Sequence, residues 1–398
     1  MARCGENMTA CRQSRGAAAR DDSQLDWPGA REESRFRRAL ITWFRRHQRA
    51  LPWRDQPSGY RVWVSEIMLQ QTQVITVVDY FNRFISKFPT VAKLAAADEA
   101  EVLKLWEGLG YYRRARQLHA AAKQIVAEQI EADHRGEFPE SFERVLALPG
   151  VGRYTAGAIM SIAFDRPFPI LEGNTIRVFT RLLGLKANAR EKQSEQTLWA
   201  FSESLLPKGK GSRDLNQGLM ELGSEICRVR QPDCPNCPVR AWCRAFAEGI
   251  QDKLPVLTPR MEYQSRHDAL VVVSRGDRYL LRKCGAGENW TGLWDFPRIT
   301  LGEPTAETRQ MSLEARVAAR MKTEFGLRLA VDPSTKQLRH AVTKYRITLD
   351  CFQGRIEGRL PAVARDFAWV STEELMSLPL NATGRKVANW IRTERLKK

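Results

Sequence analysis

The sequence predicts a mainly α-helical protein that carries a separate α+β domain at its C-terminal end. Apolar residues recur at helical spacing through residues 35–247, and no strong strand pattern interrupts them. A proline-containing segment without periodicity follows at residues 248–265. Beyond it the apolar period changes to two, which is typical of half-buried strands. A chain of 398 residues is long enough for both domains.

The helical region begins after a basic segment. Residues 1–34 are rich in Arg, Ala, Gly and Ser without a helical period, which predicts a disordered basic tail. Helices are then expected near residues 35–47, 61–78, 100–107, 112–131, 140–147, 153–164, 173–184, 192–206 and 213–226.

The C-terminal domain is expected over residues 266–398. Alternating runs at residues 269–274 and 278–283 flank Arg275-Gly276-Asp277, which is a hairpin signal. A helix is expected at residues 308–325, further strands at 337–342, 345–352 and 367–370, and a closing helix at 383–396.

The chain carries an excess of positive charge that points to a polyanionic partner. The formal net charge of +17 extends beyond the N-terminal tail. The sequence has neither an apolar run of about 18 residues nor an apolar signal segment, so no membrane association is expected. Cys4, Cys11, Cys284 and Cys351 form no disulfide framework, so a cytoplasmic protein with reduced thiols is expected.

Four further cysteines share one short segment. Cys227, Cys234, Cys237 and Cys243 have the spacing C-x6-C-x2-C-x5-C. Four thiolates this close in sequence can reach one metal centre, which suits zinc or an iron–sulfur cluster. The pattern lacks the gap of roughly a dozen residues between the two pairs of a common zinc motif. A structural zinc loop is nevertheless the alternative.

A glycine-containing turn joins two of the expected helices. Leu148-Pro149-Gly150-Val151-Gly152 lets backbone N–H groups approach an anion, and the helix from Arg153 adds its positive dipole end. Residues 148–153 therefore predict a helix-hairpin-helix motif that grips DNA phosphate without reading sequence. The alternative is a plain turn between helices.

Two carboxylates stand out by their sequence context. Glu66 lies among apolar neighbours, where a raised pKa would suit a general acid; the alternative is a solvent-facing residue. Glu172 lies at the start of an expected helix, where a carboxylate stays ionised; the alternative is a simple helix cap. A protonated and an ionised carboxylate together can break a glycosidic bond.

Five segments of the chain carry distinctive motifs: Leu51–Arg54, Trp63–Val74, Trp106–Tyr112, Leu148–Ala158 and the cysteine loop. These motifs resemble those of the adenine DNA glycosylases that act on adenine paired with 8-oxoguanine, within the endonuclease III-like superfamily. The resemblance covers residues 35–247. It implies two helical lobes, one with the hairpin motif and one with a single [4Fe–4S] cluster at the loop of residues 227–243.

The resemblance also implies roles for individual residues. Glu66 would protonate adenine N7, Tyr154 would support the transition state, and Asn174 would lie beside Glu172, where the family usually has Asp. Gln71 and Tyr111 would enter the base stack. The implied DNA-binding or base-binding residues are Arg54, Gln71, Tyr111, Gly150, Gly152, Glu221, Thr343 and Lys344.

Residues 266–398 resemble the nudix-like domain with which this family reads 8-oxoguanine. The hydrolase signature R-E-x-x-E-E-x-G is degraded over residues 319–326, so no pyrophosphatase activity is expected. Where the family commonly has Phe-Ser-His in its lesion-reading loop, this chain has Val342-Thr343-Lys344.

The resemblance implies a monomeric, nucleoid-associated enzyme that binds double-stranded DNA containing A:8-oxoguanine or A:G mispairs. It would release adenine by hydrolysis alone. One alternative is a bifunctional glycosylase/lyase like endonuclease III, which needs a Lys amine where this chain has Tyr154. Another is a non-catalytic mismatch-binding relative.

Overall fold

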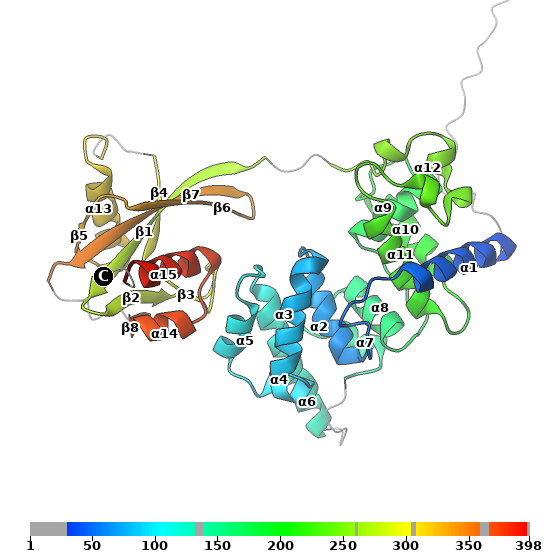
Figure 1. The fold of residues 1–398 in the computed structure, drawn as a ribbon, viewed down its shortest axis with the longest axis horizontal. Helices are drawn as coiled ribbons and strands as arrows, with labels where there is room; N and C mark the ends of the chain where they lie inside the picture. The colour runs from blue at the N-terminus through cyan, green and yellow to red at the C-terminus, as the bar shows by residue number, and fades with distance from the viewer. Residues whose placement is uncertain (1–29, 132–137, 259–261, 304–307, 359–365, 396–398) are drawn as a thin grey trace, which may run out of the picture.

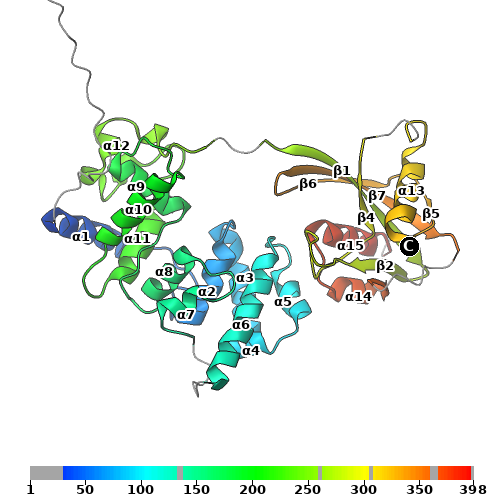
Figure 2. The same ribbon diagram turned by 180° about the vertical axis from the view of Figure 1, so that it is seen from behind.

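The computed structural model describes residues 30–131, 138–258, 262–303, 308–358 and 366–395. The described residues form a helical region and a mixed α/β domain, which contact one another through residues 104–107 and the C-terminal helices (Figures 1 and 2). This confirms the predicted fold class.

The helical region contains twelve α-helices among the described residues. They are α1 (Ala30–His47), α2 (Gly59–Leu69), α3 (Val74–Lys87), α4 (Val91–Ala95), α5 (Glu99–Trp106), α6 (Arg113–Glu131), α7 (Phe142–Leu146), α8 (Arg153–Ile162), α9 (Gly173–Leu183), α10 (Lys192–Ser204), α11 (Ser212–Glu225) and α12 (Arg244–Ala247).

Two separate apolar cores divide the helical region into a pair of lobes, as predicted. One core is built mainly from α2 to α8, and its largest buried side chains include Trp63 and Trp106. The other joins α1 to α9, α10 and α11, with Phe36 and Phe179 fully buried. Because the chain starts in one lobe, builds the other and then returns, the two lobes meet along a seam.

Three details of the helical prediction are wrong. The helix expected at residues 61–78 is two helices, because the polar run Gln70-Gln71-Thr72-Gln73 ends α2 and turns the chain into α3. The expected tail of residues 1–34 overlaps α1, which begins at Ala30; residues 1–29 lie outside the described residues. Helix α4, with five residues, is too short for periodicity to reveal.

The C-terminal domain is a mixed sheet with helices on both faces. Its elements are β1 (Gln264–Arg275), β2 (Arg278–Lys283), β3 (Trp294–Asp295), β4 (Arg298–Leu301), α13 (Leu313–Phe325), β5 (Leu329–Val331), β6 (Lys336–Val342), β7 (Tyr345–Ile356), β8 (Phe367–Ser371), α14 (Thr372–Ser377) and α15 (Ala382–Arg395).

Strand β1 lies at the centre of this sheet. It pairs in parallel with β7 and antiparallel with β4 and β2, and β6 forms a hairpin with β7. One apolar cluster packs α14 and α15 on the sheet, and another packs α13 on it. The expected linker of residues 248–265 is too long at its end, because β1 already begins at Gln264.

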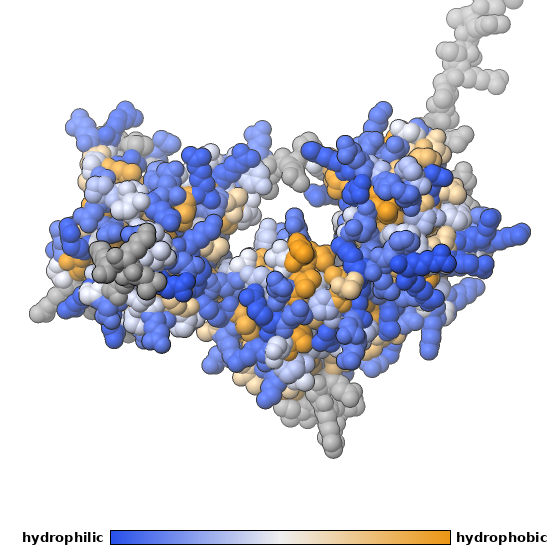
Figure 3. Space-filling model, viewed as in Figure 1, coloured by the Kyte–Doolittle hydropathy of each residue, from blue (hydrophilic) through white to orange (hydrophobic). Residues whose placement is uncertain are grey.

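No described helix is both long and apolar enough to span a membrane. The surface is largely hydrophilic, although apolar side chains gather over α3 (Figure 3), where Ile75 is 78% exposed.

Candidate active site

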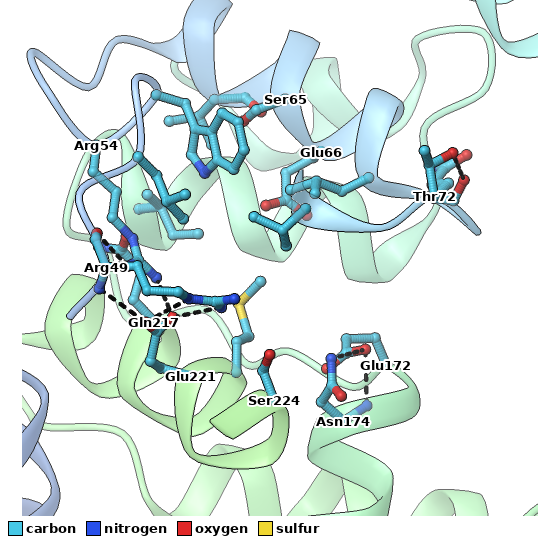
Figure 4. A pocket seen from close by; sticks show the side chains of 18 of the residues that line it. Arg49, Arg54, Ser65, Glu66, Thr72, Glu172, Asn174, Gln217, Glu221 and Ser224 are labelled. Atoms are coloured by element: carbon cyan, nitrogen blue, oxygen red, sulfur yellow. Dashed lines mark hydrogen bonds and ion pairs between the residues drawn. The ribbon is translucent and has the colours of Figure 1, made fainter. Parts of the chain in front are cut away.

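A cavity of about 450 Å³ lies at the seam between the two helical lobes. Helices α2 and α8 form one wall, and the start of α9 and helix α11 form the other (Figure 4). Seven of the predicted site residues line it: Arg54, Glu66, Gln71, Tyr154, Glu172, Asn174 and Glu221. Residues far apart in sequence therefore meet at one site.

Glu66 occupies the buried face of α2. It is only 4% exposed, which excludes the solvent-facing alternative. The Tyr154 hydroxyl donates a hydrogen bond of 2.7 Å to Glu66 Oε2. Burial raises the pKa of Glu66 from 4.5 to about 7, and the charge of Glu172 adds to the rise while Tyr154 and Arg54 oppose it. A large share of Glu66 is therefore protonated at neutral pH.

Tyr154 is held as a neutral donor. Burial and the neighbouring carboxylates Glu66 and Glu172 raise its pKa well above 10. Its helix α8 begins directly after the turn at residues 148–152, so the turn that was predicted to bind phosphate also orients this hydroxyl toward the cavity.

Glu172 both lines the cavity and caps α9. Its Oε2 accepts from the Asn174 backbone N at 2.8 Å, and its Oε1 accepts from the Thr175 N at 3.0 Å. The Thr175 hydroxyl accepts in return from the Glu172 N at 2.8 Å. Glu172 thus forms the helix cap that was the alternative to a catalytic role. The same carboxylate still lines the cavity.

The influences expected on the pKa of Glu172 need a correction. Burial raises its pKa, and the hydrogen bonds from Asn174 and Thr175 together with the charge of Arg177 work against that rise. The helix N-terminus is therefore not the dominant influence that the sequence suggested. Figure 4 shows Glu66 and Glu172 on facing walls, one on α2 and one at the start of α9.

A buried ion-pair network forms the far wall. Glu221 is 1% exposed and accepts from Arg49 Nε and Nη2, each at 2.9 Å, and from Arg54 Nη2 at 2.8 Å (Figure 4). Burial would raise the pKa of Glu221, but the hydrogen bonds from Arg49 and Arg54 lower it to about 2. Arg54 also donates to Gln217 Oε1 at 3.0 Å, and its predicted contact with DNA stays a prediction.

Sequence analysis missed Arg49 and Arg114. The only signal for Arg49 was its position just before Leu51–Arg54, because its partner Glu221 is 172 residues away. Arg114 is buried and donates to the carbonyls of Ile67 at 2.8 Å and Met68 at 3.0 Å, near the C-terminal end of α2. It resembled any other basic residue on a helix.

Over residues 64–204 the chain matches the model of the HhH-GPD superfamily of base excision DNA repair proteins, and over residues 268–390 that of the NUDIX domain. An adenine DNA glycosylase of Rattus norvegicus is 32% identical over 88% of this chain and 77% of that protein. One from Arabidopsis thaliana is 32% identical over 89% of this chain and 64% of that protein.

The chain belongs to the adenine DNA glycosylase family of base excision repair proteins. A relative from Buchnera aphidicola subsp. Schizaphis graminum is 36% identical over 68% of this chain and 77% of its own length. A solved thermostable thymine-DNA glycosylase is 28% identical, covers 55% of this chain and 98% of its own, and has a TM-score of 0.49.

In this adenine DNA glycosylase family member, two predicted base-stack residues lie at exposed, strained positions. Gln71 has φ 57° and Tyr111 has φ 48°, in the left-handed region that costs a non-glycine residue energy. Gln71 borders the cavity, whereas Tyr111 is 56% exposed and lies outside the cavity lining. Arg114 lies under the Tyr111 ring, 5.5 Å from its centroid.

The predicted hairpin glycines lie outside the cavity. Gly150 has φ +79°, and a Cβ there would come within 2.9 Å of Gln117, so the turn requires glycine. Gly152 caps α8 without a side-chain hydrogen bond and faces open space. The first N–H groups of α8 therefore remain available to an anion, as the motif predicts.

The four cysteines border one void of about 30 Å³. Among the described residues, no group of three or more His, Cys, Asp or Glu side chains is arranged to hold a single metal ion. Buried Arg181 donates to Cys227 Sγ at 3.2 Å. The four cysteine side chains that the sequence grouped by spacing therefore border the same void.

Hydrogen bonds connect the cysteine loop to the start of α9, which lines the cavity. Arg177 on α9 donates to the Cys227 carbonyl at 2.7 Å and to Asn174 Oδ1 at 2.9 Å.

Thr343 and Lys344 lie at the turn between β6 and β7, away from the cavity. The β6–β7 end reaches toward the helical region in both ribbon views.

Proposed function

We propose that the protein removes adenine from A:8-oxoguanine and A:G mispairs in double-stranded DNA by hydrolysing the N-glycosidic bond. The observation that carries this proposal is the buried Glu66–Tyr154 pair, with Glu172 across the cavity. It joins a buried acid with a raised pKa to a second carboxylate, on the scaffold of the adenine DNA glycosylase family.

The chemistry follows from the two carboxylates. Glu66 gives its proton to adenine N7, so that the base leaves neutral when the bond from C1′ to nitrogen breaks. The Tyr154 hydroxyl holds the resulting Glu66 carboxylate by the same hydrogen bond. Glu172 stabilises the positive charge that develops on the sugar, an effect that is stronger in a buried site than in water. Water then adds its oxygen to C1′ and returns a proton to a carboxylate.

Hydrolysis without strand cleavage agrees with the side chains at the cavity. A lyase step needs an amine that forms a Schiff base with the sugar. No lysine is found among the described residues that line the cavity, and Tyr154 cannot form an imine. This supports the monofunctional reaction over the glycosylase/lyase alternative.

DNA would lie across the rim of the cavity. The open N-terminus of α8 accepts a backbone phosphate, and the net charge of +17 adds long-range attraction. Gln71 and Tyr111 enter the base stack as adenine is extruded, since a flipped base leaves a gap to fill. Thr343 and Lys344 contact the opposing base from the β6–β7 turn.

The cysteine loop would hold one [4Fe–4S] cluster through Cys227, Cys234, Cys237 and Cys243. Four cysteines around a common void suit either such a cluster or a zinc ion, and membership of the endonuclease III-like superfamily favours the cluster. The cluster would cross-link the loop. Arg177, which binds both this loop and Asn174, would carry that rigidity to the active site.

The test is single-turnover release of adenine from duplexes that contain A:8-oxoguanine, A:G, A:C or A:T pairs. We expect fast release from the first, slower release from the second and no strand cleavage. Binding without release from any duplex would favour the non-catalytic relative, and cleavage that borohydride traps as a covalent adduct would favour the lyase.

A further inference from the structure

The C-terminal domain is docked on the helical lobe that carries Glu66. Leu293 belongs to the C-terminal domain but is fully buried in the core of that lobe. A Cβ at Gly292 would come within 3.1 Å of Glu99 and 3.3 Å of Leu103, both on α5. The contact is thus a close-packed interface between the domains.

A half-buried ion-pair network fastens this interface. Arg385 on α15 pairs with Glu107, the C-cap residue that follows α5, and the two side chains are only 16% and 12% exposed. Arg385 Nη2 lies 3.1 Å from Glu107 Oε2 and also donates to the Leu378 carbonyl at 2.6 Å. Lys104 Nζ donates to Glu107 Oε2 at 3.1 Å and to the Met376 carbonyl at 2.9 Å.

This network holds both ends of the loop that presents Tyr111. At the start of the loop, the Leu380 N donates to Glu107 Oε2 at 3.5 Å. At its end, the Tyr112 hydroxyl donates to the Leu380 carbonyl at 3.4 Å. One residue of the C-terminal domain therefore fixes the ends of a loop from the helical region.

The conformation of the loop requires such support. Gly108 (φ +102°), Gly110 (φ +72°) and Tyr111 (φ +48°) all have left-handed backbone angles. Such angles persist in a non-glycine residue only where the surroundings over-determine them. The far side of the loop meets Arg114, which donates to the Gly110 carbonyl at 3.3 Å and to the Ile67 carbonyl, next to Glu66, at 2.8 Å.

We propose that Arg385 and Glu107 are positioning residues that hold the Tyr111 loop in its working conformation. The C-terminal domain then acts on adenine excision through this contact, in addition to reading the opposing base. The inference rests on the proposed function for its kinetic effect, and on geometry alone for the ordering of the loop.

The experiment compares Arg385→Met with Arg320→Met in the full-length protein. Arg320 also forms an ion pair, with Glu324, but on α13 away from the interface. Hydrogen–deuterium exchange of the backbone at residues 107–112 should rise in Arg385→Met and stay at the wild-type level in Arg320→Met. Exchange that is unchanged in Arg385→Met would overturn the proposal, whatever the activity of the protein.

A kinetic cycle then tests whether Arg385 acts through Tyr111. We expect Arg385→Met to slow single-turnover adenine release from A:8-oxoguanine by about tenfold, because small misplacements of positioning groups are costly. In a Tyr111→Ala background the same change should have no further effect. If the rate losses of the two single variants multiply in the double variant, the proposal is overturned. A wild-type protein that releases no adenine would instead refute the proposed function.

Discussion

The Tyr154 hydroxyl lies 2.7 Å from Glu66 Oε2, although the two residues are 88 positions apart in the chain. The helix-hairpin-helix turn sets the start of α8 and hence the place of Tyr154, while a Ser58 cap sets the start of α2 and hence that of Glu66. The turn predicted to bind DNA phosphate and the residue proposed to protonate the base are therefore linked through one hydrogen bond.

The pH dependence of excision should follow Glu66. Because burial raises its pKa to about 7, the single-turnover rate should fall as the pH rises through about 7 and the acid loses its proton. The Tyr154 hydrogen bond lowers that pKa, so Tyr154→Phe should move the midpoint to higher pH. As a control, Tyr60→Phe removes a buried tyrosine hydroxyl that bonds the Phe88 carbonyl and should leave the midpoint in place. A midpoint that falls in Tyr154→Phe would contradict this assignment.

Glu172 should affect the rate more than it affects the fold. Glu172→Gln keeps an oxygen that can cap α9, so the free energy of unfolding should change by no more than about 1 kcal/mol. Loss of the charge beside the sugar should slow excision by at least about a hundredfold. Glu172→Asp, which restores the residue usual in the family, should retain activity or increase it. A Glu172→Gln variant as fast as the wild type would leave Glu172 with only its capping role.

Glu221 should matter mainly for stability. Glu221→Ala leaves two guanidinium groups without their buried partner and should cost about 3 kcal/mol of unfolding free energy, near the low end for such sites because Arg49 is partly exposed. Glu225→Ala is the matched control, since this exposed residue also pairs with Arg49 and should cost less than about 1 kcal/mol. If urea unfolding shows equal losses of unfolding free energy in the two variants, the buried ion-pair network is not a major source of stability.

The ion pairs of Glu221 should stop stabilising the fold at strongly acidic pH. The pKa of Glu221 is lowered from 4.5 to about 2, so its stabilising contribution is complete above pH 4.5 and disappears as the pH falls toward 2. The difference in unfolding free energy between wild type and Glu221→Ala should shrink over that window.

Replacing one cysteine of the loop should prevent the proposed iron–sulfur cluster from being held at all. Cys234→Ser should give protein without iron or labile sulfide and with weaker DNA binding, because Arg177 ties this loop to α9. Iron and sulfide analysis of the purified wild type is the measurement. Stoichiometric zinc without iron in the wild type would exclude the cluster.

The sequence predicted the site better than it predicted the contacts that hold it. Glu66, Tyr154 and Glu172 were recognised from their motifs, but spacing alone could not decide whether Glu66 faced solvent. The partners of Arg49 and Arg385 lie 172 and 278 positions away, and no local pattern encodes such pairs. Strand β3, with two residues, was invisible because alternation needs a longer run.

The central claim is that Glu66 protonates adenine, and Glu66→Gln tests it most directly. Gln keeps the shape of the side chain but cannot supply a proton, and general acid catalysis is typically worth about 10²–10⁴-fold. Single-turnover release and duplex affinity should be measured together on an A:8-oxoguanine duplex. We predict that release falls at least about a hundredfold while affinity stays near the wild-type value. Release at the wild-type rate, or loss of affinity in step with release, would contradict the account.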